Sequence, residues 1–245
     1  ERTGRITMLD GDLRYVRSAP APMGAFGGLW VPSEQTLIIN ASVHDPSRAG
    51  QPLLAFDAAG NYLRPLGAEQ PVLLMGRDHQ LARAMAPARH GGLWTIPQVE
   101  RFMLERWDPA GRVVQRLHRP GSWLRPYPTT DRLWEVPPVP MVLDVAETAE
   151  GRLWVVGRVP DRHWKQAITL QQDAEGRVYP AGIDFDRYQD TMLELLDPAT
   201  GRVLLRTRLP DAWGWVTADG LLMRAAERED GQWTVVVHRL TVQGL

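Results

Sequence analysis

A hairpin signature that occurs four times along the 245 residues constrains the fold more than any other feature of the sequence. In each copy an apolar run ends in an aspartate, a short turn follows, and a second run begins. The four aspartates are Asp10, Asp57, Asp108 and Asp197. An aspartate that opens a turn can accept a hydrogen bond from the backbone two residues on. The last three turns also contain a glycine, whose positive φ can close a bulged hairpin. These glycines are Gly60, Gly111 and Gly201.

The spacing of the hairpins indicates a repeat of four strands. The first three aspartates are 47 and 51 residues apart, and a Gly-rich turn followed by Leu-Trp precedes two of the hairpins, at residues 91–94 and 150–154. Antiparallel repeats of about 40–50 residues with four strands are typical of β-propeller blades. The sequence therefore predicts an all-β fold: one β-propeller domain over residues 1–245, with about four to five blades of four antiparallel strands, named A to D.

The interval between the last two aspartates is longer, at 89 residues. Much of the excess lies between Val159 and Asp190, which predicts an insertion at 159–190 in the B–C loop of one blade. The alternative is a degenerate blade, with residues 168–179 as its outer hairpin.

The two ends of the sequence suggest that blades are missing. The chain begins with Glu1 rather than Met, opens on an outer hairpin and ends on a third strand. We therefore expect the propeller to be incomplete at its N-terminus. The sequence leaves the compartment open, and export after removal of a leader is one interpretation.

Composition narrows the range of partners. Twenty-eight basic and 29 acidic residues give a formal net charge of −1, so no nucleic-acid partner is expected. No apolar run approaches the about 20 residues of a membrane-spanning helix. The chain has no cysteine, which excludes disulfides, thiolate catalysis and Cys-ligated metals. The expected partner is an unidentified small molecule or protein.

The sequence contains no catalytic motif that we can identify. Its six histidines form no two-His metal motif, and no nucleophile elbow, phosphate-binding loop or dinucleotide-binding motif is present. Asp184 and Asp186 could bind Ca²⁺ together with backbone oxygens. Alternating acids in a loop are usually solvated, so the expectation is that the protein holds no metal and no other cofactor.

Four segments resemble a known group of proteins: residues 56–60, 107–112, 150–154 and 196–198. They are similar to uncharacterised bacterial six-bladed β-propellers of the broad NHL-like class. The resemblance implies a six-bladed type of fold. Such relatives include scaffolds, ligand binders and metal-dependent lactonases or esterases. No catalytic residue of a relative can be carried over to a position of this chain.

Two functions are consistent with this resemblance. The first is a non-enzymatic binding or interaction module that uses the loop-rich face of the propeller. The alternative is a metal-dependent hydrolase of the lactonase or esterase kind, with its site at the central channel. Carboxylates and amides that converge at the channel would favour the hydrolase, whereas an apolar or Arg-lined site without a metal would favour the binding module.

Strand order predicts which face carries the site. Because successive strands run antiparallel, the B–C loops and the D–A links lie on one face and the short hairpin turns on the other. Four long irregular connections, at 43–52, 66–80, 120–140 and 159–190, all fall on the first face. Function tends to reside on such loops, although they could instead only cap the ring. The predicted ligand-binding residues are Arg162, His163 and Trp164 above all, then Trp123, Arg125, Tyr127, His44, Asp45, Asp186 and Tyr188.

Seven of the ten tryptophans fall into two groups by position. Those at repeated strand positions are expected to pack between blades: Trp94, Trp107, Trp154 and Trp215. Trp123, Trp134 and Trp164 lie in irregular segments, where they could form an aromatic platform for a ligand or cover blade edges.

Overall fold

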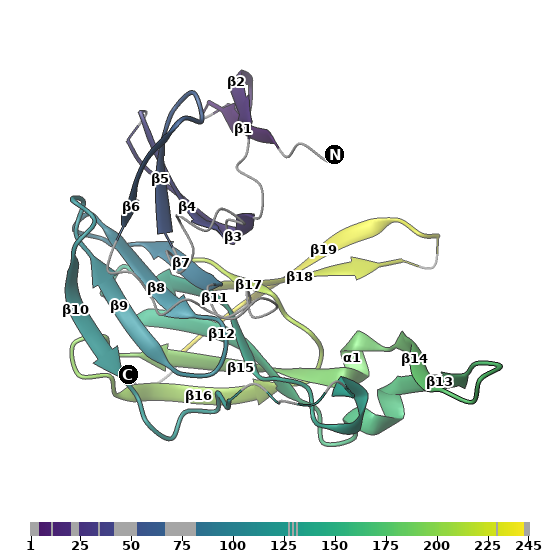
Figure 1. Ribbon diagram of the computed structural model, residues 1–245. Coiled ribbons are helices and arrows are strands. Elements are labelled where there is room, and N and C mark those ends of the chain that lie inside the picture. Colours follow the sequence, from purple (N-terminus) through teal and green to yellow (C-terminus); the bar gives the residue numbers. More distant parts are fainter. Residues whose placement is uncertain are drawn as a thin grey trace. The chain divides into compact units, whose positions relative to one another are not determined.

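The computed structural model describes residues 5–10, 12–20, 25–33, 35–41, 53–66, 82–126, 128, 130, 132–228 and 230–242. Most of the regular structure in these ranges is β-strand (Figure 1). In the described part of the chain, no helix has both the length and the apolar character that a membrane crossing requires.

Three of the sheets have four strands each. One contains β3 (Ala25–Ser33), β4 (Thr36–Ala41), β5 (Leu53–Asp57) and β6 (Tyr62–Leu66). Another contains β7 (Arg83–Pro87), β8 (Leu93–Pro97), β9 (Met103–Trp107) and β10 (Val113–His118). The sheet called here the main sheet has the order β11 (Met141–Glu147), β12 (Leu153–Pro160), β15 (Gln189–Leu196) and β16 (Val203–Leu209).

The remaining strands form smaller sheets. The end sheet has three strands, β17 (Trp215–Val216), β18 (Leu221–Glu227) and β19 (Trp233–Arg239). Two hairpins stand by themselves: β1 (Arg5–Leu9) with β2 (Tyr15–Pro20), and β13 (Ile168–Gln172) with β14 (Val178–Ile183).

The three four-stranded sheets and the end sheet are propeller blades. In β4 the consecutive residues Leu37, Ile38 and Ile39 are all buried, because side chains from neighbouring sheets cover both faces. A sheet whose two faces are both covered shows continuous apolar runs in place of the alternation of a half-exposed sheet. The fold is an all-β propeller with about four blades of antiparallel strands, as the sequence predicts.

The chain divides into two compact units. The first comprises Glu1–Gln98 with Glu105–Arg116, and the second comprises Val99–Leu104 with Leu117–Leu245. In the first unit, one apolar cluster joins the sheet β3–β6 to residues of strands β7–β10. In the second, another cluster joins the main sheet to the end sheet. The prediction of a single propeller domain over residues 1–245 stays a prediction.

The hairpin chemistry expected from the sequence is confirmed. Gly60, Gly111 and Gly201 have φ values of 90°, 80° and 74°. At the third hairpin, Asp108 Oδ1 accepts a hydrogen bond from the backbone N–H of Arg112 at 2.9 Å. The backbone and side chain of Arg112 both hydrogen-bond to this carboxylate, and they hold the pKa of Asp108 below its ordinary value. The aspartate therefore organises the turn in its ionised form.

Three of the four tryptophans expected in the core are buried there, and the fourth is not. Trp94, Trp107 and Trp154 are at most 5% exposed. The expectation for Trp215 is wrong, because its side chain is 52% exposed. Trp213 occupies the core in its place, from the link that precedes β17.

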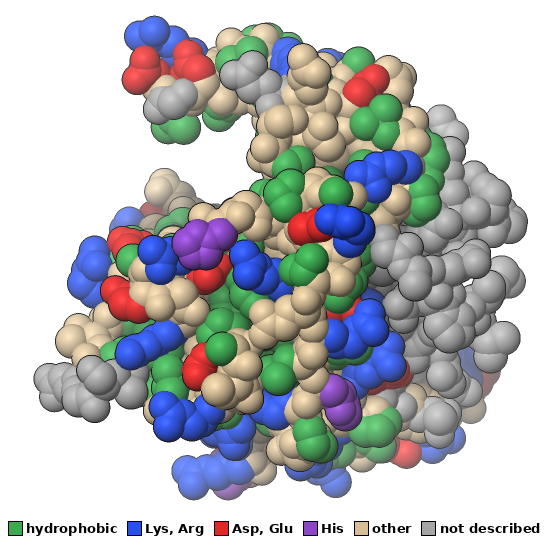
Figure 2. Space-filling view, turned by 90° about the vertical axis from the view of Figure 1, so that its left-hand side faces the viewer, with side chains coloured by type: hydrophobic (Ala, Val, Ile, Leu, Met, Phe, Trp, Pro, Cys, Tyr) green, Lys and Arg blue, Asp and Glu red, His purple; other side chains and the backbone are tan. Residues whose placement is uncertain are grey.

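Charged side chains of both signs occur on one face of the chain. On the side shown in Figure 2, Lys and Arg side chains lie among Asp and Glu side chains.

Candidate functional site

The two longest irregular segments of the second unit meet the main sheet at the same end. Strand β12 ends at Pro160, which lies opposite Gln189, the first residue of β15. Strand β11 begins at Met141, opposite Arg158 near the end of β12. The link before β11 and the segment between β12 and β15 therefore both join this end of the sheet, which we call the loop end.

Residues 161–188 leave the main sheet between its second and third strands. They contain the 3-10 helix η4 (Trp164–Ala167), the hairpin β13–β14 and the short helix α1 (Phe185–Tyr188). Among the described strands, β13 and β14 pair only with each other. The outer hairpin considered for a degenerate blade is therefore present, but it projects from within a B–C connection.

Trp164 packs inside this segment. It is 8% exposed, and its ring meets the ring of Tyr188 edge to face at a centroid distance of 6.3 Å. The Nζ of Lys165 lies 5.6 Å from the centroid of the Trp164 ring. These contacts attach η4 to α1, so Trp164 holds the segment together. A role for it in ligand contact stays a prediction.

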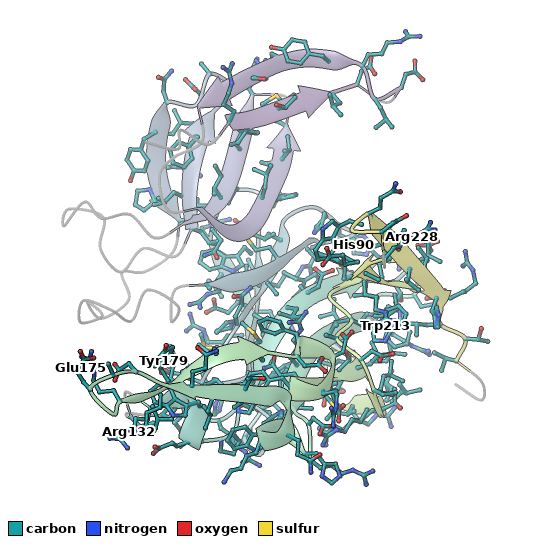
Figure 3. All side chains as sticks on the ribbon, turned by 90° about the vertical axis from the view of Figure 1, so that its right-hand side faces the viewer. His90, Arg132, Glu175, Tyr179, Trp213 and Arg228 are labelled. Carbon is teal, nitrogen blue, oxygen red and sulfur yellow. The ribbon has the colours of Figure 1, made fainter. Side chains whose placement is uncertain are left out.

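A surface pocket of about 540 Å³ lies where the link approaches the β13–β14 hairpin. Its walls come from the 3-10 helix η3 (Leu133–Glu135) and the preceding residue on one side, and from residues 175–178 on the other. In Figure 3, Arg132 lies near the tip of the hairpin that carries Glu175, and Tyr179 lies on the same hairpin. Trp134 supplies the aromatic wall.

The charges of this pocket are paired with one another. Arg132 Nη1 lies 3.1 Å from Glu135 Oε1. Across the pocket, Arg177 Nη2 lies 2.9 Å from Glu175 Oε2, and its Nε lies 2.8 Å from Asp173 Oδ2. The pocket therefore offers both signs of charge beside one indole ring.

Trp123 lies against the main sheet because residue 157 is a glycine. A Cβ at Gly157 would lie 2.1 Å from the Cη2 atom of Trp123 and 2.6 Å from the backbone oxygen of Met141. Any larger residue would displace the indole ring from β12. The Nε1 atom of Trp123 is buried and has no hydrogen-bond partner among the residues that the structure describes.

The core between the main sheet and the end sheet becomes polar at the loop end. Trp154 and Val156 of β12 belong to that core, and Arg158 is the next residue on the same face. Thr191 lies directly opposite Arg158 on β15. On β18, Arg224 follows the core residue Leu222 on the same face. These polar residues, with Asp144 of β11, form what we call the polar layer.

Arg224 is surrounded by weakly paired acids and an indole ring. Its Nη1 lies 3.8 Å from Asp186 Oδ1, and its Nη2 lies 4.0 Å from Asp211 Oδ2. Its Cζ lies 5.3 Å from the centroid of the Trp213 ring. The backbone N–H of Trp213 donates to Thr191 Oγ1 at 2.8 Å, which fixes the indole below the guanidinium group.

Asp144 carries the most perturbed carboxyl group of the layer. Its Oδ2 accepts a hydrogen bond from the backbone N–H of Val216, and its Oδ1 accepts one from Val145, each at 2.9 Å. Burial nevertheless raises the pKa of Asp144 to about 6, against an ordinary value of 3.8. Burial disfavours the charged form by more than the two hydrogen bonds favour it.

Ionisation of Asp144 is expected to make stability fall as pH rises from about 4 to about 6. Because its pKa is higher in the folded state, folded protein binds this proton more tightly, and losing it costs on the order of 2–3 kcal/mol. Chemical denaturation at pH 4 to 7 measures the slope. Asp144→Asn should flatten it, whereas Asp219→Asn should keep it, because the pKa of Asp219 is lowered and its titration lies below this range. A slope that persists in Asp144→Asn would contradict the assignment.

The sequence-predicted site residues that the structure describes lie in the segments that join the loop end. Arg162 and His163 are exposed in the turn before η4, and Arg125 is exposed in the link. Tyr188 packs on Trp164, while Asp186 reaches the polar layer. His44, Asp45 and Tyr127 lie outside the described residues. The structure thus brings Trp164 and Tyr188 into contact, whereas the Asp186 side chain lies near Arg224 of the polar layer.

Sequence reasoning missed the polar layer. The available signal was a charged residue that continues an apolar alternation, as Arg158 does after Trp154 and Val156. Among the described residues, no three His, Cys, Asp or Glu side chains are grouped so that they could hold a metal ion. The expectation that the protein holds no metal stays a prediction, and so does the alternative of calcium at Asp184 and Asp186.

Comparisons with known proteins give distant similarity to solved structures. No protein-family model and no curated protein sequence matches the chain. The Dos1 propeller is 10% identical, with a TM-score of 0.40 over 90% of this chain and 59% of that one. The quinohemoprotein alcohol dehydrogenase ADHIIG from Pseudomonas putida HK5 is 12% identical, with a TM-score of 0.42 over 92% of this chain and 46% of that one.

A protein of unknown function from Bacteroides caccae is 11% identical, with a TM-score of 0.36 over 95% of this chain and 79% of that one. The present chain thus spans about three fifths and about half of the length of the first two structures. At this level of similarity, the description of the fold rests on the sheets of the chain itself.

Proposed function

We propose that the chain is a non-enzymatic binding module that holds a small organic ligand at the loop end of the main sheet. The observation that carries the proposal is the pocket of about 540 Å³ between the η3 link and the β13–β14 hairpin. Its volume lies within the range of about 300–1,000 Å³ that is common for ligand sites.

The origin of the pocket walls supports this function. Both walls come from irregular segments, while the strands that anchor those segments belong to a sheet with a buried core. Binding residues are disproportionately found on loops that a rigid scaffold positions. Such an arrangement can vary its ligand without changing the blade.

The chemistry of the pocket suggests an aromatic ligand with a charged group. Trp134 provides an apolar, polarisable surface against which a ring can stack. Arg132 and Arg177 are paired with Glu135 and Glu175, and all four side chains are exposed. Exposed ion pairs contribute only about 0–1 kcal/mol, so a ligand ion can exchange with either partner at little cost.

Two finer hypotheses accompany this proposal. One is that the propeller is of the six-bladed, NHL-like class that the blade motifs resemble. The other is the metal-dependent hydrolase alternative with its site at the central channel, which stays a prediction without a residue assignment. A partner protein in place of a small ligand would use the same loop end.

Saturation-transfer NMR with small aromatic ions tests the pocket. The probes are benzoate, benzylamine and indole-3-acetate, and we expect at least one to bind with a Kd on the order of millimolar. Trp134→Ala should abolish that signal. It should leave the melting temperature unchanged, because the helix η3 that contains Trp134 has no buried residue. Trp233→Ala, which removes an indole that is 68% exposed on β19, is the matched control. Absence of binding by all three probes, or binding that survives Trp134→Ala, would reject the pocket.

A further inference from the structure

Two guanidinium groups in the polar layer have unused hydrogen-bond donors. Each arginine carries five N–H donors, and neither Arg158 nor Arg224 donates a side-chain hydrogen bond to any residue in the described ranges. The Nε atoms of both are buried from solvent. Buried donors without acceptors are costly, so an arrangement that leaves them open is unusual for a purely structural cluster.

The neighbouring acidic side chains do not accept hydrogen bonds from these guanidinium groups. Asp186 and Asp211 approach Arg224 only at 3.8 and 4.0 Å, beyond hydrogen-bond distance, and their side chains are 60% and 44% exposed. Arg158 has no ion pair with a described residue, although the charge of Asp186 acts on it. Asp144 also belongs to the layer, but both of its oxygens already accept backbone N–H groups.

Burial makes Arg158 a particularly poorly compensated cation. Burial lowers the pKa of Arg158, and Asp186 opposes the shift. The desolvation of a charged group is costly unless a partner of opposite charge and hydrogen bonds compensate for it. An oxyanion that accepted N–H donors from this guanidinium would supply both.

The local framework holds the second guanidinium in place. Arg224 lies over the ring of Trp213, which is 5% exposed and anchored through Thr191. Stacking on an indole fixes the orientation of the guanidinium plane, and the N–H donors at the edge of that plane remain available to a ligand. The side chain of Arg224 is itself 23% exposed, so a small anion can reach it from solvent.

We propose that Arg158 and Arg224 form an anion site that binds the carboxylate or phosphate group of a small ligand. Planar guanidinium groups match both oxyanions by bidentate hydrogen bonding. The proposal rests on the proposed function in placing ligand binding at the loop end, but it uses other residues than the pocket. Asp186 then acts as a competitor that the ligand must displace.

Calorimetric titration of the full chain with inorganic phosphate and, separately, with glutarate tests the site. Ionic strength is held constant with chloride. Charge-assisted hydrogen bonds are worth about 1.5–3 kcal/mol, so Arg224→Gln should weaken binding by about tenfold or more. Asp186→Asn removes the competitor and should tighten binding by about three- to tenfold. Arg239→Gln removes one exposed positive charge in the same unit and should change affinity by less than about twofold.

The outcomes separate the possibilities. Binding of phosphate alone assigns a phosphate ligand, and binding of glutarate alone assigns a carboxylate ligand. Absence of binding by both anions, or equal weakening by Arg224→Gln and Arg239→Gln, overturns the site. If an arginine variant fails to fold, Asp186→Asn still tests the site. Weaker anion binding by Asp186→Asn would also overturn the proposal.

The same variants distinguish this site from the pocket. Trp134→Ala should leave the phosphate and glutarate titrations unchanged, and Arg224→Gln should leave the aromatic probes bound. If the unsubstituted chain bound none of the aromatic probes but still bound an anion, the pocket would be rejected and the anion site would be kept.

Discussion

Replacing Glu194 by glutamine is expected to lower the free energy of unfolding of the second unit by about 3–5 kcal/mol. Glu194 is fully buried in β15. Its Oε2 lies 2.6 Å from Arg119 Nη2, and its Oε1 lies 2.7 Å from Arg206 Nε. Arg119 is only 12% exposed and stacks on Phe102, with 3.9 Å from its Cζ to the ring centroid. The substitution would leave this buried cation without its counter-charge.

Urea denaturation followed by circular dichroism measures the effect. Arg206→Gln is the matched control, because the side chain of Arg206 is 46% exposed and its loss leaves Glu194 paired with Arg119. We expect that variant to cost about 1 kcal/mol or less. The double substitution of Glu194 and Arg119 by methionine should recover much of the loss, since it removes both buried charges. A small effect of Glu194→Gln would mean that Arg119 is compensated by another group.

Trp164→Ala is expected to destabilise the 161–188 segment locally by about 3 kcal/mol. Truncating a buried aromatic side chain typically costs about 3–5 kcal/mol, and the lower value suits a small satellite cluster. The loss falls on the contact between η4 and α1, because the Trp164 ring packs on Tyr188. Pairing of β12 with β15 does not involve this ring, so the main sheet should keep its stability.

Amide hydrogen exchange can separate local from global loss. The reporters are the N–H groups of Gln166, Asp184 and Arg187, which hydrogen-bond to His163, Ala167 and Asp184 within the segment. Their exchange should accelerate by about a hundredfold in Trp164→Ala, while the amides of β15 keep their protection. Trp164→Phe should retain most of the protection. Unchanged exchange at all three reporters would show that the ring is dispensable for the segment.

The parts of the fold that depend on local chemistry could be predicted from the sequence. The turn at Asp108 and Gly111 is specified by a side-chain acceptor and a positive φ within four residues. Repetition of that turn predicts the blades, and blade order predicts that the link before β11 and the segment after β12 share one end of the sheet. Each of these steps uses information that is adjacent in the chain.

The parts of the site that depend on packing between sheets could not be predicted. Arg158 and Arg224 are far apart in sequence, and only the stacking of the main sheet on the end sheet places them in one layer. Trp164 looks like an exposed aromatic in an irregular segment until α1 covers it. Trp215 was expected to face the core, but β17 contains only Trp215 and Val216. The buried tryptophan is Trp213, which precedes the strand.

The last two hairpin repeats also share a buried glutamate. Glu105 and Glu194 each stand three residues before a hairpin aspartate, and both are buried. Glu105 pairs with Arg116 at 2.8 Å, as Glu194 pairs with Arg206. In the last two hairpins, a glutamate on the third strand and an arginine on the fourth strand thus form the same cross-strand ion pair.

Because Pro160 pairs directly with Gln189, the segment between them can change without changing the blade. The two ends of the 161–188 segment already face each other across a formed ladder, so the blade closes whatever the segment contains. The entropic cost of a longer closed loop grows only logarithmically with its length. A lineage can therefore lengthen, shorten or replace this segment while the blade remains intact. Under the proposed function, ligand preference would then diverge faster than the blade architecture.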